Sequence, residues 1–188
     1  ILQAQRLDSS APRDSEMLPV VNAAIVELSS RLLDETRNDP ALAGMGSTLV
    51  MALVRPPRAI IAHLGDSRAY LHRRMQLLRL TTDHSLAATL LATQRLSLNE
   101  LANHPSRDQL TQYVGMPAEP VPAVQAVALE SADRILLCTD GLTGMLSDDE
   151  IAAIMNSGSQ NELLLRQLIS AANDAGGRDN VTALICSI

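Results

Sequence analysis

The sequence predicts an α+β fold in one domain, residues 1–188, with mostly antiparallel sheets. Strand-like and helix-like segments come in separate groups along the chain rather than in strict alternation, which is typical of helices layered on antiparallel sheets. A length of 188 residues suits a single domain, and a hydrophobic share of 46% is enough for a sizeable core. Because there is no Phe or Trp, and only Tyr70 and Tyr113, that core must be aliphatic.

Composition also restricts the partners and the compartment. The formal net charge of -6 argues against a nucleic-acid-binding surface. No apolar run approaches membrane-spanning length and no signal peptide is recognisable, so we expect no membrane partner. Cys138 and Cys186 both lie in apolar, strand-like runs, which indicates buried thiols in a reducing compartment. We therefore expect a cytoplasmic protein.

The N-terminal part is predicted to be helical. Residues 1–7 look like the end of a helix whose beginning is absent, and a polar loop follows. The next helix is predicted from near Ser15 to near Arg37, with Pro19 in its first turn, where a missing N–H costs little. Its apolar residues recur at spacings of three and four and form one stripe: Leu18, Val21, Ile25, Leu28 and Leu32.

Three strands are predicted next, over residues 48–54, 59–64 and 68–72. The last two flank the tight turn Gly65-Asp66-Ser67 and together predict a β-hairpin with a carboxylate at its tip. A helix then begins within residues 81–86, capped by Asp83 or Ser85.

The remaining elements follow from capping boxes and apolar runs. Gly176 is placed where a helix end favours a left-handed residue. The predicted helices begin at residues 97–100, 147–150 and 159–162, and the predicted strands span residues 121–129, 134–138 and 181–186.

Two carboxylates mark the end of one predicted strand and the start of another. Asp140 directly follows the apolar run that ends in Cys138, and Asp179 precedes the last strand. If these strands are antiparallel neighbours, both carboxylates meet at one edge of a sheet on rigid supports. Such a pair can hold a hard metal ion, act as an acid and base, or belong to a salt-bridge cluster.

A third aspartate, Asp66, shares the pattern of an acidic residue beside a turn. Each of these aspartates alone is common in a turn, because an Asp side chain can hydrogen-bond to its own backbone. The order of the three aspartates and their flanking residues are more specific. From about Gly44 to the C-terminus, the sequence resembles the bacterial form of the type 2C metal-dependent Ser/Thr protein phosphatases. The matching pieces are Gly44-Met-Gly-Ser-Thr-Leu49, His63-Leu-Gly-Asp-Ser-Arg-Ala-Tyr-Leu71, Leu80-Thr-Thr-Asp-His-Ser-Leu86, Leu136-Leu-Cys-Thr-Asp-Gly-Leu142 and Gly177-Arg-Asp-Asn-Val-Thr182.

The resemblance implies a four-layer αββα sandwich, two antiparallel sheets flanked by helices, with two or three Mg²⁺ or Mn²⁺ ions at one edge. It implies that Asp140 and Asp179 hold the main catalytic metal, and that Asp66 shares a weaker third site with Asp140. It also implies hydrolysis of phosphoserine and phosphothreonine in proteins by a metal-activated water. The implied partners are a phosphoprotein substrate and a cognate Ser/Thr kinase system.

The chain departs from this family pattern at its N-terminal end. The family's phosphate-binding Arg, its Asn-Glu-Asp strand and its Asp-Gly-x-Gly-Gly turn have no counterpart here. Gly44-Met-Gly46 is not that turn, because no Asp precedes it. We therefore expect an N-terminally incomplete phosphatase domain that is weak or inactive on its own. The alternatives are a pseudo-phosphatase that acts as a regulatory binding module, and a carboxylate cluster with only a structural role.

Polar residues near these motifs have simpler interpretations. Asp83 and His84 are either polar catalytic groups or caps of the following helix, and His63 fits a core or edge position. Arg68 fits local packing and pairing better than phosphate binding. Ser67 lacks the Gly-x-Ser-x-Gly elbow of a serine hydrolase.

Overall fold

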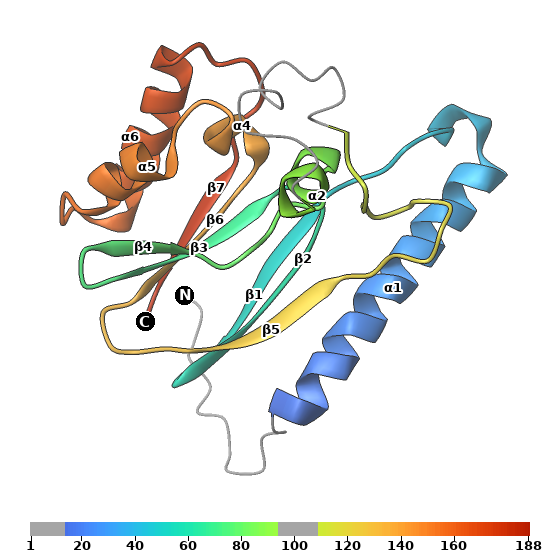
Figure 1. Ribbon diagram of the computed structural model, residues 1–188, viewed down its shortest axis with the longest axis horizontal. Coiled ribbons are helices and arrows are strands. Elements are labelled where there is room, and N and C mark those ends of the chain that lie inside the picture. The colour runs from blue at the N-terminus through green and yellow to red at the C-terminus, as the bar shows by residue number, and fades with distance from the viewer. Residues whose placement is uncertain (1–13, 94–108) are drawn as a thin grey trace.

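The computed structural model describes residues 14–93 and 109–188. In this part of the chain two sheets lie face to face and helices cover both outer faces, which confirms the αββα sandwich (Figure 1). The helix predicted at residues 97–100 and the opening residues 1–7 fall outside the described residues. In chain order the elements are α1 (Asp14–Asn38), the 3-10 helix η1 (Pro40–Leu42), β1 (Leu49–Arg55), β2 (Arg58–Leu64), β3 (Arg68–Arg73), β4 (Gln76–Arg79), α2 (Leu86–Ala92), β5 (Ala123–Ala128), β6 (Arg134–Cys138), α4 (Asp140–Thr143), α5 (Asp148–Met155), α6 (Asn161–Asp174) and β7 (Ala183–Ser187).

Both sheets are antiparallel at every described strand pair. One sheet has the order β1-β2-β5 and the other β4-β3-β6-β7. The expected pairing of the strand before Asp140 with the last strand is confirmed, because β6 and β7 are neighbours with Cys138 opposite Ala183. The end of β6 and the start of β7 therefore share one edge of the sandwich.

Alternating side chains of the central strands build three core layers. On β2, Ile60 and Leu64 face α1, whereas Ile61 faces the other sheet. On β3, Leu71 faces the inter-sheet core and Tyr70 faces α5 and α6. This period of two is what a strand buried on both faces requires. The aliphatic core predicted from the composition is confirmed, with Tyr70 as the largest fully buried side chain.

Helix α1 occupies the predicted range but differs in two details. Pro19 lies inside the helix rather than in its first turn, since α1 is already helical from Asp14. Val21 and Ile25 are buried against the sheet as predicted, whereas Leu28 is 46% exposed and points away from it. No helix in the described ranges 14–93 and 109–188 is both long and apolar enough to cross a membrane.

The predicted hairpin at Gly65-Asp66-Ser67 is wrong. Strand β2 pairs with β1 and β5, and β3 pairs with β4 and β6, so residues 65–67 cross from one sheet to the other. The hairpin partner of β3 is β4, a strand that the sequence pattern did not predict. Its turn uses Arg74 and Met75 at positive φ, without the Gly or Asn that normally signals such a turn.

Helix starts agree with the sequence where a side-chain cap forms. Ser147 and Glu150 make the predicted capping box of α5, and Ser85 rather than Asp83 caps α2. The box predicted at residues 159–162 is absent, because α6 has Gln160 as its N-cap residue without a side-chain hydrogen bond. The last strand begins at Ala183 rather than at Val181.

A buried ion pair closes the sandwich at the end where β3 and β5 finish. Asp133 is only 1% exposed and accepts hydrogen bonds from Arg73 Nε (2.8 Å), Arg73 Nη2 (2.6 Å) and the Glu130 amide (2.7 Å). The bonds from Arg73 hold the pKa of the Asp133 carboxyl below its ordinary value. Because the folded pKa is below the unfolded one, this stabilisation is present above about pH 4 and is lost as the pH falls through the folded pKa.

Asp133→Asn should therefore destabilise the chain at pH 7 by about 2 kcal/mol, the usual scale for hydrogen bonds to a charged group. The difference between the two proteins should be smaller at pH 3 than at pH 7, because pH 3 lies below the ordinary pKa of an aspartate, where part of this stabilisation is lost. Urea unfolding at both pH values measures this. An equal difference at pH 7 and pH 3 would show that the charge of Asp133 is not the stabilising feature.

Candidate metal centre

Thr139 joins the end of β6 to the start of β7 and so places Asp140. Its backbone N–H donates to Thr182 O (3.0 Å), and its hydroxyl oxygen accepts from the Thr182 amide (3.0 Å). The Thr139 hydroxyl also donates to Asn180 O (3.3 Å). Asp140, the first residue of α4, is thereby held beside the segment that carries Asp179, with its carboxylate exposed.

Gly141 shows how closely the two segments approach. A Cβ on this residue would lie 2.2 Å from Asn180 O and 3.4 Å from the Asp179 carbonyl carbon. Only glycine fits at this distance, because the colliding atoms belong to the backbone. Gly141 lies in α4 and has no positive φ, so the glycine is needed here for packing.

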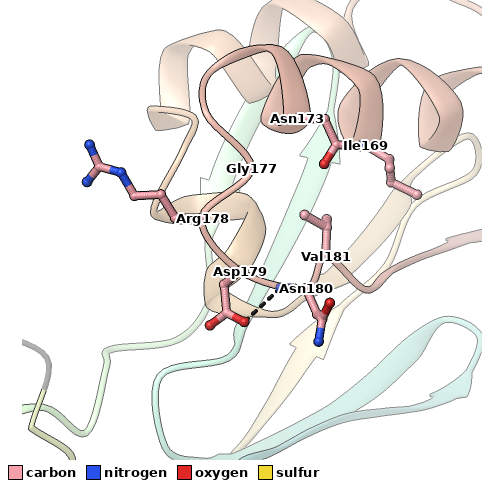
Figure 2. A pocket seen from close by; sticks show the side chains of 7 residues that line it. All are labelled: Ile169, Asn173, Gly177, Arg178, Asp179, Asn180 and Val181. Atoms are coloured by element: carbon pink, nitrogen blue, oxygen red, sulfur yellow. Dashed lines mark hydrogen bonds between the residues drawn. The ribbon is translucent and has the colours of Figure 1, made fainter.

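Asp179 lies in the loop between α6 and β7 rather than at the strand start, four residues before Ala183. Helix α6 ends with Gly177 N donating to Ala172 O (3.1 Å), and Gly176 and Gly177 both have positive φ, as predicted for Gly176. One oxygen of the exposed Asp179 carboxylate accepts from the Asn180 amide at 2.7 Å (Figure 2).

A pocket of about 560 Å³ borders Asp179, between the α6 end and the loop. The Arg178 side chain extends away from the other labelled side chains of this pocket (Figure 2). The lining residues are Ile169, Asn173, Gly177, Arg178, Asp179, Asn180 and Val181.

Asp66 sits on the crossing between the two sheets. Its pKa is raised to about 6, first by burial and then by the negative charge of Asp140. Strand β3 starts at Arg68 opposite Cys138 of β6, so Asp66 and Asp140 each lie two residues beyond the same paired end of the sheet. The two carboxylates repel each other when both are ionised, which a bound divalent cation would relieve.

The donor types suit Mg²⁺ or Mn²⁺, because the carboxylates of Asp66, Asp140 and Asp179 are the hard oxygen ligands that these ions prefer. However, no group of three or more His, Cys, Asp or Glu side chains in residues 14–93 and 109–188 is close enough to hold a metal ion as it stands. The structure brings Asp66 toward Asp140 and the backbone of Asp179 toward Gly141. It does not bring the three carboxylates into one compact cluster.

Sequence reasoning missed the charged network beside the centre. Asp83 accepts from Arg68 Nε (3.0 Å) and Arg68 Nη2 (2.8 Å), and it also pairs with Arg79. Tyr70, fully buried, donates its hydroxyl hydrogen to Asp148 (2.7 Å). Local pairing of Arg68 is thus confirmed. The Tyr70–Asp148 contact joins residues 78 positions apart, and no local pattern could have indicated it.

Comparisons with known proteins agree with the motifs. A family model described as protein phosphatase 2C matches residues 4–181. Protein phosphatase PhpP of Streptococcus pneumoniae serotype 2 is 38% identical over 166 residues, which cover 88% of this chain and 68% of that protein. The Serine/threonine phosphatase stp of Listeria monocytogenes serotype 4b is 35% identical over 161 residues, 86% of this chain and 64% of that protein. The chain thus spans about two thirds of the length of these relatives.

Solved structures show the same fold. The serine/threonine phosphatase of S. agalactiae has a TM-score of 0.88 and 30% identity, and the match covers 96% of this chain and 75% of that chain. The catalytic domain of PstP, solved in complex with two manganese ions, has a TM-score of 0.79 and 30% identity over 95% of this chain and 74% of that chain. The chain belongs to the protein phosphatase 2C family, the metal-dependent protein Ser/Thr phosphatases.

Proposed function

We propose that Asp140 and Asp179 hold the main Mg²⁺ or Mn²⁺ of a phosphoprotein phosphatase site, and that Asp66 shares a weaker ion with Asp140. The observation that carries this proposal is the meeting of three chain segments at one edge. The Thr139 hydrogen bonds join the ends of β6 and β7, and the Asp140 charge acts on Asp66. The manganese complex of the related PstP domain supports the choice of metal.

The residues of this chain supply negatively charged carboxylates and hold them in position. When bound, the metal would lower the pKa of a coordinated water and offset the charge that develops on a phosphate ester. Asp140 stands on a four-residue helix anchored by Thr139, and Asp66 stands on a crossing fixed by both sheets. Rigid supports of this kind keep carboxylates in place without a metal, so that less ordering is needed when it binds.

We further propose that the complete site needs a segment upstream of residue 1, because the sequence lacks the family's metal-bridging Asp. The substrate is proposed to be a phosphoserine or phosphothreonine protein, supplied by a cognate Ser/Thr kinase system in the cytoplasm. The free thiols of Cys138 and Cys186 are consistent with that location. No comparison favours the pseudo-phosphatase alternative.

The test compares residues 1–188 with a longer protein that carries the family's N-terminal motifs ahead of them. The longer protein should hydrolyse p-nitrophenyl phosphate in a Mn²⁺-dependent manner, whereas residues 1–188 alone should be a poor catalyst. Full metal-dependent turnover by residues 1–188 would show that the catalytic ligands are wrongly assigned. No turnover by the longer protein at any Mn²⁺ concentration would favour the pseudo-phosphatase.

A further inference from the structure

Two hydrogen bonds fix the residue before Asp66 to His84. The His84 backbone N–H donates to Gly65 O (2.9 Å), and the Gly65 N–H donates to His84 Nδ1 (3.3 Å). The second bond requires an unprotonated Nδ1, so the neutral imidazole carries its hydrogen on Nε2. Burial, followed by the neighbouring His63, lowers the pKa of His84 to about 4, which agrees with a neutral ring.

The His84 ring is itself held in place. It stacks on His63 with ring centroids 4.5 Å apart and an interplanar angle of 22°. His63, which is buried in β2, has its Nε2 2.8 Å from Thr82 O and therefore donates to that carbonyl. Residues on both sides of His84 are engaged elsewhere, Asp83 with Arg68 and Ser85 at the start of α2. The imidazole thus has one orientation toward Gly65.

Thr48, the residue before β1, packs against the opposite side of the crossing. Its hydroxyl is 2.8 Å from the hydroxyl of the buried Ser67. A Cβ at Gly65 would lie 2.5 Å from Thr48 Cγ2, so the crossing is packed against Thr48 without spare room. Asp66 therefore lies between two residues that are each fixed by a different neighbour.

We propose that His84 is a positioning residue for Asp66. Its Nδ1 and backbone N–H hold Gly65, and this fixes the carboxylate of Asp66 in the direction of Asp140. The inference rests on the proposed function, since it gives His84 a role only if Asp66 binds a metal. Groups that orient a metal ligand commonly change metal affinity by 10–100-fold when they are removed. A His84 that merely filled the core would change stability without changing metal affinity.

The experiment uses the 188-residue chain and measures free Mn²⁺ by electron paramagnetic resonance in a titration, with a thermal melt of each variant. His84→Leu should weaken the Asp66-dependent Mn²⁺ binding about tenfold or more. His84→Asn should recover most of the affinity, because the Asn Oδ1 is as many bonds from Cβ as Nδ1 and can accept from Gly65.

His72→Leu is the matched control. His72 is buried, whereas His84 is half-buried; it is held by a side-chain bond to Asn156 Oδ1 (2.8 Å) and lies toward the other end of β3. His72→Leu should lower the melting temperature, as His84→Leu does, and leave Mn²⁺ binding unchanged. The inference is overturned if His84→Leu binds Mn²⁺ like the native chain, if His84→Asn is as weak as His84→Leu, or if His72→Leu weakens binding equally.

Asp66→Ala separates this inference from the proposed function. If Asp66→Ala weakens Mn²⁺ binding and His84→Leu does not, the positioning role fails and the metal assignment stands. If Asp66→Ala leaves all Mn²⁺ binding unchanged, the assignment of Asp66 fails and the role of His84 fails with it.

Discussion

Gly141→Ala is expected to destabilise the chain and to weaken Mn²⁺ binding together. Gly141 is helical, so alanine would by itself be the better residue there, by about 1 kcal/mol. The new Cβ, however, would lie 2.2 Å from Asn180 O, a backbone atom that cannot turn aside. The segments that carry Asp140 and Asp179 would have to separate. Overpacking of this kind typically lowers the free energy of unfolding by about 1–3 kcal/mol. Urea unfolding and a Mn²⁺ titration of the same variant measure both effects.

Gly158→Ala is the control for this substitution. Gly158 has φ +73, and a Cβ there would meet no atom within 4 Å. An alanine at this position costs about 1 kcal/mol of backbone strain and should leave Mn²⁺ binding intact. If Gly141→Ala bound Mn²⁺ as well as Gly158→Ala does, the close approach of the two segments would be irrelevant to the metal.

Asp140→Ala is expected to abolish turnover at any Mn²⁺ concentration in a longer protein that carries the family's N-terminal motifs. Asp140 is proposed to contact both metal sites. Losing several kcal/mol of the transition-state stabilisation that the metals supply lowers the rate roughly a thousandfold. Asp66→Ala should slow the reaction less, about tenfold, and raise the Mn²⁺ concentration needed while the tight site stays intact. A Mn²⁺ titration of activity beside a binding isotherm distinguishes the two variants.

Both substitutions should leave the fold in place, because the two carboxylates lie at an edge rather than in a core cluster. Removing either one should slightly stabilise the metal-free chain, since Asp140 raises the pKa of Asp66 through like-charge repulsion. Asp34→Ala, on the exposed side of α1, is the neutral control. The assignment is wrong if Asp66→Ala loses tight metal binding while Asp140→Ala keeps it.

Local sequence patterns predicted the elements that carry the centre. The apolar run 134–138, bounded by charge on one side and glycine on the other, gave β6 with its observed ends. Short apolar segments bounded by turn residues predicted β1, β2 and β3 within one residue at either end. These patterns work because a strand buried on both faces needs little beyond its own residues to be recognised.

Partners far apart in the sequence could not be predicted. Gly65-Asp66-Ser67 between two apolar strands fits a hairpin and a crossing between sheets equally well, because the pattern contains no information on which strand pairs with which. The β4 hairpin was missed since Arg74 and Met75 are unusual residues for positive φ. The pairing of Arg73 with Asp133 and the proximity of Asp66 to Asp140 likewise depend on how the sheets stack.

The most direct test of the metal assignment is the binding of Mn²⁺ to residues 1–188. An ion that binds only the native chain at 100 times its dissociation constant stabilises it by about 2.7 kcal/mol, and the melting temperature rises accordingly. We expect this rise, and a matching binding heat, in the native chain, and we expect both to disappear in Asp140→Ala with Asp179→Ala. If thermal melts and titration calorimetry of the native chain were both unaffected by Mn²⁺, Asp140 and Asp179 would not form a metal site.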